Sequence, residues 1–459
     1  MKRNQWVKSK SVVMPALAIV AALASSFTLA ATPDDKLMQA LRVGDITKAG
    51  LALDAGAKPN QLRADGSLPL AWAAEAQNLA LVKLLLAKGA KPDADALQNK
   101  SQNLSQSFSP LVVACQRGDP AIVAALLDAG AEVNRPTATG ISPLALCAGH
   151  STAAAVKRLL ELGAEVEAAD ETGQTPLMWA AANGQVEAIN LLIAQGAKVN
   201  RLSKAGFSPL FFALKSPNPQ APLAMLAAGG DASYRTPDGT SAVQMAIYQH
   251  QFDVAAVLFK RGAGLSDADL TAFDRNGNQL LHAAILNRQP ALVDLLLAQG
   301  ANPNALTGTS NVVWRYEVNF TSRPYVAYPK SPLFLAVERG APEIMKILVA
   351  AGADTKFRIE DGTNLVLAAA VTDPATLEQA FRLAPDMNVT NKRGQTPLLS
   401  LMNGASYLPI TNPQLHELFK VLSNHGARID IADTKGQTPK DLAQTEEFRA
   451  KTEFADVFL

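Results

Sequence analysis

Two kinds of short apolar segment alternate along most of this chain, separated by polar turns that are rich in glycine. The first kind follows a Ser/Thr-Pro-Leu sequence, and the second has apolar residues at helical spacing. The prolines recur every 33 residues over three successive intervals, at Pro110, Pro143, Pro176 and Pro209. Repetition at one fixed period predicts a solenoid, in which each unit packs only against its neighbours.

Each unit is predicted to form two helices, as residues 172–200 illustrate. Thr175 can cap the first helix, and Pro176 suits its first position, where a backbone N–H would be unpaired anyway. Gly184 ends that helix, because glycine readily adopts a left-handed backbone conformation. The second helix has apolar residues at the i, i+1, i+3 and i+4 positions, namely Ala188, Ile189, Leu191 and Leu192.

This unit resembles the ankyrin repeat. It has Gly-x-Thr-Pro-Leu at 173–177, an alanine pair at 180–181 and Gly-Ala-x-x-Asn at 196–200. The resemblance implies an all-α repeat solenoid of paired antiparallel helices with hairpin-like finger loops, and a role in binding proteins rather than in catalysis. The proline position of the motif marks about twelve units, at Lys36, Pro69, Pro110, Pro143, Pro176, Pro209, Ala242, Leu280, Pro332, Leu365, Pro397 and Pro439.

The first thirty residues have a different pattern. Basic residues precede a short apolar stretch at 12–24, and Thr28-Leu29-Ala30 offers a small-x-small cleavage site before Ala31. This is the layout of a secretory signal peptide. A transmembrane anchor is the weaker alternative, because the apolar stretch is shorter than the ~20 residues that span a bilayer. We therefore expect a signal peptide at 1–30 and a mature monomer, 31–459, that is periplasmic or secreted and has no membrane insertion after cleavage.

The charge balance argues against nucleic-acid binding. The chain has 42 Lys and Arg against 41 Asp and Glu; without the four basic residues of the leader, 38 against 41 leaves a formal charge of −3. Binding to nucleic acid depends on basic residues that neutralise phosphates, and the chain has no basic run. We expect a protein partner and no nucleic acid.

No catalytic constellation is visible either. The five histidines are scattered, and the sequence has neither a Gly-rich phosphate loop with a following Lys-Ser/Thr nor a Gly-x-Ser-x-Gly turn. The acidic stretch at 267–276 lacks the spacing of a calcium loop. Trp72 and Trp179 lie on predicted first helices, where packing accounts for them. We expect no enzyme activity, no cofactor and no metal site.

The two cysteines, Cys115 and Cys147, occupy alanine-type positions of neighbouring units. We favour the interpretation that both are small buried side chains. The alternative is a disulfide between the third and fourth units, which an oxidising compartment would permit. It requires Cα atoms within ~7 Å of each other.

Four intervals exceed the period, with extra residues near 94–107, 266–273, 305–330 and 404–413. Insertions in repeat proteins map to loops, often on the binding face. The insertion at 305–330 is rich in aromatic residues and arginine, which are enriched at interface hot spots, and its β-prone part predicts a long hairpin. An alternative is that its rings pack back on the solenoid. We predict that its partner-binding residues are Trp314, Arg315, Tyr316, Phe320, Arg323, Tyr325 and Tyr328.

These observations predict an exported protein that binds another protein through its concave face and its finger insertions. A narrower alternative is an inhibitor or immunity-type protein that blocks a toxic enzyme in the same compartment, with tight binding to that one enzyme. A remote alternative is an enzyme whose site lies in an insertion.

Overall fold

The computed structural model describes residues 32–61, 68–93, 109–274, 276–308, 328–404, 411–446, 448 and 450–459. The predicted signal peptide at 1–30 and the insertion at 94–107 therefore lie outside the described residues. The chain divides into two compact units, residues 1–110 and residues 111–459. No helix among the described residues is both long and apolar enough to cross a membrane.

Among its described residues, the first unit contains two helix pairs, and within each pair the helices pack against each other. The helix that opens the second pair starts at the predicted proline, Pro69. The four helices are α1 (Pro33–Val43), α2 (Ile46–Asp54), α3 (Pro69–Glu75) and α4 (Leu79–Ala87).

In the part of the second unit that the structure describes, the same pattern continues with ten more pairs, counting α5 from Pro110. The first helices of the pairs are α5 (Pro110–Arg117), α7 (Pro143–His150), α9 (Pro176–Ala182), α11 (Pro209–Leu214), α13 (Ala242–Tyr248), α16 (Leu280–Leu286), α18 (Pro332–Glu338), α20 (Leu365–Ala369), α22 (Pro397–Gly404) and α24 (Pro439–Gln444). The second helices are α6 (Pro120–Asp128), α8 (Ala153–Glu161), α10 (Val186–Ala194), α12 (Gln220–Ala227), α14 (Phe252–Lys260), α17 (Pro290–Ala298), α19 (Pro342–Ala350), α21 (Pro374–Leu383), α23 (Asn412–Asn424) and α25 (Lys451–Phe458).

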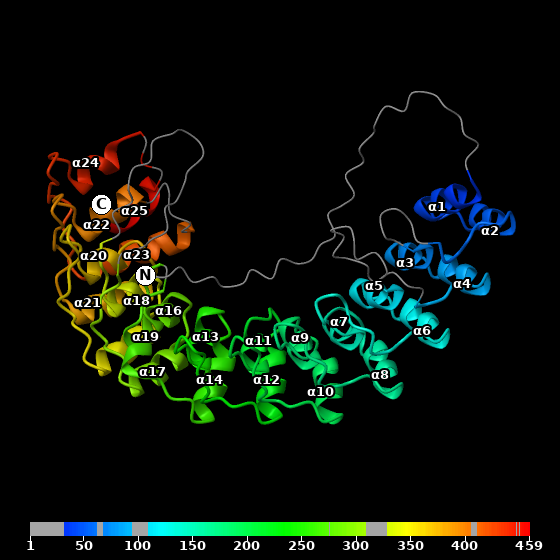
Figure 1. Ribbon diagram of the computed structural model, residues 1–459. Helices are drawn as coiled ribbons and strands as arrows, with labels where there is room; N and C mark the ends of the chain where they lie inside the picture. The colour runs from blue at the N-terminus through cyan, green and yellow to red at the C-terminus, as the bar shows by residue number, and fades with distance from the viewer. Residues whose placement is uncertain are drawn as a thin grey trace. The chain divides into compact units, whose positions relative to one another are not determined.

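The prediction of a helical repeat solenoid with about twelve units is confirmed. Within the second unit, the first helices α7, α9, α11 and α13 lie in one row and α8, α10, α12 and α14 in another (Figure 1). The helices are stacked through fully buried residues, such as Leu177, Ala180 and Ala181 of α9 and Leu192 of α10. The alanine pairs let neighbouring first helices approach closely, which fixes the rows.

Helix starts and ends follow the predicted local chemistry. The Ser142 hydroxyl accepts a hydrogen bond from the Ala145 N–H at 3.1 Å and caps α7, whose first residue is Pro143. Gly184, with a φ of 71°, ends α9 in the left-handed region. His250 has a φ of 58° at the corresponding turn of a later repeat, a conformation that is uncommon for residues other than glycine.

Asparagine side chains connect successive repeats outside the helices. The Asn134 amide donates to the Gly163 carbonyl at 3.0 Å, and its oxygen accepts from the Glu165 N–H at 2.9 Å. One repeat later the position holds Glu167, whose carboxylate accepts from the Lys198 N–H at 2.9 Å. These bonds satisfy backbone groups of the turns that follow the second helices.

Backbone hydrogen bonds also join neighbouring fingers. The Glu171 N–H donates to the Thr139 carbonyl at 3.1 Å, and the Lys204 N–H donates to the Thr172 carbonyl at 2.9 Å. The corresponding residue of the next finger is Pro237, which has no N–H to donate. In that finger the Tyr234 hydroxyl donates to the Gly206 carbonyl at 2.7 Å.

The extra residues near 266–273 form a short helix, α15 (Asp267–Thr271), with Ser266 as its capping residue. Asp269 of this helix is buried and pairs with both guanidinium nitrogens of Arg235, at 3.0 and 2.7 Å. Although burial raises the pKa of Asp269, hydrogen bonds from Arg235 and Ser266 outweigh that effect and lower it. This ion pair holds the extra helix against the preceding finger. In the insertion near 404–413, residues 405–410 lie outside the described residues, between α22 and α23.

Candidate functional site

One position of the repeat differs from its buried neighbours. It lies three residues after the residue that opens each first helix, and its side chain ranges in size from alanine to tryptophan. In the second unit five of the ten side chains are buried and five are half-buried, and the half-buried ones include two aromatic rings, Trp179 and Phe212. They belong to α9 and α11, successive first helices that pack against each other. The exposed surface of the first helices is therefore aromatic at this junction.

The Trp179 ring is fixed from several sides. Its Nε1–H donates to Asp170 Oδ2 at 3.4 Å, and the other oxygen of Asp170 accepts from the backbone N–H groups of Thr172 and Gln174, each at 2.9 Å. The ring also lies edge-on to His150, with centroids 6.1 Å apart. The indole thus bridges its own finger and the end of the preceding first helix, in one orientation.

Phe212 extends this surface into the next repeat. Its ring packs edge-on against Phe207, with centroids 6.5 Å apart, and both rings are half-buried. We call Trp179, Phe207 and Phe212 the aromatic patch. Partly exposed aromatic rings in fixed orientations are the side chains that dominate protein interfaces, since little conformational entropy is lost when a partner binds.

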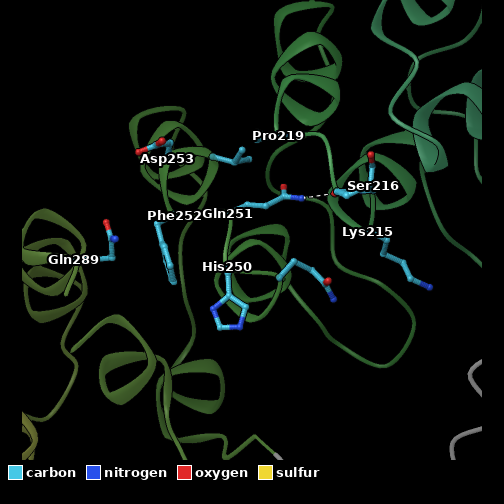
Figure 2. A pocket seen from close by; sticks show the side chains of 11 residues that line it. Lys215, Ser216, Pro219, His250, Gln251, Phe252, Asp253 and Gln289 are labelled. Atoms are coloured by element: carbon cyan, nitrogen blue, oxygen red, sulfur yellow. Dashed lines mark hydrogen bonds between the residues drawn. The ribbon is translucent and has the colours of Figure 1, made fainter. Parts of the chain in front are cut away.

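A cavity of about 420 Å³ lies at the edge where the two helices of a pair are joined, across three successive repeats (Figure 2). Gln251 is 9% exposed, and its amide nitrogen donates to the Leu214 and Ser216 carbonyls at 3.1 and 2.8 Å. Its carbonyl oxygen has no hydrogen-bond partner. The lining residues are Lys215, Ser216, Pro217, Pro219, Gln249, His250, Gln251, Phe252, Asp253, Val254 and Gln289. Gln251 therefore links two repeats. Both polar and apolar side chains line the cavity.

His282 of α16 is held by hydrogen bonds on both sides of its ring. Its Nδ1 accepts from the Gln279 N–H at 3.1 Å, and its Nε2 lies 2.8 Å from the Ala305 carbonyl, to which it donates. Burial lowers the pKa of the fully buried imidazole. The ring therefore ties α16 to the start of the long insertion. Among the described residues, no three His, Cys, Asp or Glu side chains are grouped so that they could hold a metal ion.

Of the predicted partner-binding residues, only Tyr328 is described, and it is half-buried. Trp314, Arg315, Tyr316, Phe320, Arg323 and Tyr325 lie outside the described residues. The ends of the insertion are nevertheless joined, because the Thr307 N–H donates to the Lys330 carbonyl at 3.0 Å and the Lys330 N–H donates to Thr307 Oγ1 at 2.9 Å. Phe273 and Leu306 are exposed close to this base, at 52% and 44%.

Cys115 of α5 and Cys147 of α7 form a disulfide, with Cα atoms 4.4 Å apart. Both side chains are fully buried, as in the interpretation that we favoured from the sequence, but the sulfur atoms are bonded, as in the alternative. The bond joins the first helices of two successive repeats. Because it is buried between these helices, the disulfide stabilises the stack.

The sequence interpretation missed the exposure of Trp179, which it assigned to packing alone. A signal was present: the residue three places after the helix start is Val113, Leu146, Trp179, Phe212 and Met245 in successive repeats. The Trp179 and Phe212 rings are larger than their neighbours Val113, Leu146 and Met245, and they are half-buried where those three side chains are buried.

Comparison with known proteins agrees with this architecture. A family model described as ankyrin repeats in three copies matches residues 37–137, 111–203, 144–224 and 210–307, which together run over 271 of the 459 residues. The chain is also similar to Ankyrin repeat and SOCS box protein 6 of Homo sapiens and to the protein of the same name of Pongo abelii, each 33% identical over 136 residues. The similar stretch covers 29% of this chain and 31% of each relative, less than a third of their length.

Proposed function

Because the chain belongs to the ankyrin-repeat family, we propose that it is an exported protein that binds another protein through the concave face formed by its first helices and through the insertion at 305–330. The observation that carries this proposal is the aromatic patch. Ankyrin repeats mediate protein–protein interactions in general, and here Trp179, Phe207 and Phe212 supply fixed, partly exposed rings on the first helices and fingers.

Two observations support export. The leader at 1–30 has the basic, apolar and small-residue segments of a signal peptide. The Cys115–Cys147 disulfide fits an oxidising compartment such as the periplasm, where such bonds persist. Neither observation depends on the binding surface, so export is tested by itself. N-terminal sequencing of the protein from a periplasmic fraction should give Ala31 as the first residue. A cytoplasmic protein that retains Met1 would refute export.

Binding is tested by capture with the mature chain, residues 31–459. We expect one or a few proteins from periplasmic extract to be retained by the wild type. Trp179→Ala should weaken the captured complex about thirtyfold or more, since removal of an aromatic hot spot costs ~2 kcal/mol or more. Glu187→Ala is the matched control, because Glu187 is exposed on the second helix of the same repeat.

The identity of the captured protein also distinguishes the narrower alternative, an inhibitor or immunity-type protein, from a scaffold. An inhibitor or immunity-type protein would retain a single enzyme and abolish its activity at equimolar concentration. A scaffold would retain a partner without that effect. Equal binding by the wild type and by Trp179→Ala would remove the aromatic patch from the proposal.

A further inference from the structure

Three exposed apolar side chains share one position of the repeat. Each finger turn is closed by a backbone hydrogen bond, such as the one from the Ser203 N–H to the Phe207 carbonyl at 3.0 Å. The residue directly before the turn is, in four successive repeats, Leu202, Arg235, Phe273 and Leu306, which we call the finger row. Among the described residues eight large apolar side chains are exposed, and the finger row supplies three of them. A single exposed apolar side chain is ordinary, but recurrence at one repeat position indicates a binding surface.

Arg235, the one charged member of the finger row, is already neutralised within the chain. Its guanidinium nitrogens lie 3.0 and 2.7 Å from the carboxylate oxygens of Asp269, and one of them also donates to the Gly239 carbonyl at 3.0 Å. The row therefore offers apolar contact without a charge that a partner must match. An uncharged apolar segment complements it, whereas a charged segment would lose hydration there without gaining a counter-ion.

The finger row connects the two surfaces that we propose for partner binding. At one end, Leu202 precedes a turn that ends at a ring of the aromatic patch. At the other end, Leu306 lies beside the paired ends of the insertion at 305–330. Phe273 packs against the same base, because a Cβ atom at Gly308 would lie 3.2 Å from its ring. A partner that contacts both surfaces therefore crosses the finger row.

The spacing of the row favours one backbone conformation in the partner. Packed helices lie roughly 8–10 Å apart, so equivalent finger residues recur at about this step, and four of them span roughly 24–30 Å. Every third residue of a polyproline II segment lies on one face, and three residues rise roughly 9 Å. A β-strand repeats one face every roughly 6.7 Å, and an α-helix rises roughly 10.5 Å over seven residues. Polyproline II therefore matches the step of the row best.

We infer that the partner presents a polyproline II segment whose large apolar side chains, spaced by three residues, dock on Leu202, Phe273 and Leu306. An uncharged residue of the segment faces Arg235. This inference rests on the proposed function and names the chemistry of the partner. A preformed polyproline II segment loses little conformational entropy when it docks on exposed apolar side chains.

The experiment uses two peptides of equal composition, each with fluorescein at the N-terminus and an amide at the C-terminus. The matched peptide is Leu-Pro-Pro-Gln-Pro-Pro-Leu-Pro-Pro-Leu, with its leucines on one face of a polyproline II helix. The control is Leu-Pro-Pro-Gln-Leu-Pro-Pro-Pro-Leu-Pro, with its leucines on three different faces. The readout is fluorescence anisotropy during titration with the mature chain, residues 31–459. We expect the matched peptide to bind at least tenfold more tightly than the control.

Substitutions on the protein locate the binding. Phe273→Ser combined with Leu306→Ser should weaken binding of the matched peptide at least tenfold, and both side chains are exposed, at 52% and 44%, so the fold should be kept. Leu162→Ser is the matched control, because Leu162 is 41% exposed but follows α8, outside the finger row. Circular dichroism checks that each variant is folded.

Equal affinity for the two peptides, no binding of the matched peptide, or equal losses in the double variant and in Leu162→Ser would overturn the inference. These measurements need no captured protein, so they are independent of the test of the proposed function. If they fail while Trp179→Ala still weakens the captured complex, the proposed function stands and only the polyproline II segment is wrong.

Discussion

The repeats at 110–233 and those at 234–338 stack the same helix pairs but connect their fingers differently. In the first region, backbone N–H groups join one finger to the next, as Lys204 joins Thr172. In the second, Pro237 has no N–H for this bond, the Gly308 N–H again donates to the Gly277 carbonyl, and side chains such as Arg235 and His282 hold the longer connections. The helices α13, α16 and α18 nevertheless remain packed in order. Helix stacking is therefore kept where one backbone bond between fingers is replaced by side-chain bonds, and the second region holds long insertions without losing the order of its helices.

The largest effect on stability is expected from a substitution in the buried core between the stacked helices. Leu192 has no exposed surface, so Leu192→Ala should lower the free energy of unfolding by ~2–5 kcal/mol through lost contacts and a cavity. Leu191 of the same helix is only half-buried, and Leu191→Ala should cost clearly less. Urea unfolding followed by circular dichroism measures both.

The same variants test whether different segments of the repeat array unfold separately or in a single cooperative transition. Each unit of a solenoid touches only the adjacent units, so a local defect should separate the transitions of different segments. Coincident transitions by circular dichroism and tryptophan fluorescence, in the wild type and in Leu192→Ala, would count against this modular behaviour.

Removal of the disulfide should lower the stability of the repeats at 110–233 by nearly as much as Leu192→Ala does. Replacing both Cys115 and Cys147 by alanine should lower the free energy of unfolding by ~2–4 kcal/mol, because the unfolded chain loses a cross-link across 32 residues. The comparison is with the oxidised wild type in the same buffer. An unchanged midpoint would mean that burial of the two side chains, rather than the bond between them, supplies the stability.

The insertion should matter for binding and little for folding. Deletion of 309–327 leaves the paired ends at Thr307 and Lys330 in place, so the melting temperature should stay close to that of the wild type. We predict that Trp314→Ala weakens the captured partner by ~2 kcal/mol or more, about thirtyfold. Calorimetry and thermal melting on one sample test both statements. Unchanged affinity with a clear drop in melting temperature would show that the rings pack on the solenoid.

The smallest expected effect is a pH dependence at His282. Burial lowers its pKa in the folded protein, so the unfolded chain takes up a proton first as the pH falls. Its contribution to stability is therefore complete above about pH 6.5, the usual value for histidine, and decreases as the pH falls toward the folded pKa. The free energy of unfolding should fall more between pH 7.5 and 5.5 in the wild type than in His282→Gln. Equal pH dependence in the two proteins would contradict this assignment.

The periodic part of the fold could be predicted from the sequence because its causes are local. Proline at the first helical position, a capping Ser or Thr and a left-handed glycine act within one turn, and they place helix starts such as Pro143 and Pro176 correctly. The disulfide could not be chosen in the same way. Cys115 and Cys147 are 32 residues apart, one short of the period, and only the close approach of α5 and α7 brings their Cα atoms to 4.4 Å.

The exposure of the rings at the candidate site depends on the residues packed around them, and the spacing of the repeat does not specify those residues. The sequence places Trp179 on a first helix, but its exposure depends on Gly149, on His150 and on the finger that carries Asp170. The insertion at 305–330 stands out by composition, whereas the aromatic patch consists of residues that a repeat motif treats as variable. Variation in size at one motif position was the available signal for the patch.

The two tryptophans at one repeat position show how duplicated repeats can diverge. The Arg42 guanidinium lies over the Trp72 ring, 5.7 Å from its centroid, whereas Trp179 has Asp170 and His150 as its neighbours. The side chains around one motif position can thus change from repeat to repeat while the buried leucines between the helices stay the same, and selection can act on each junction separately.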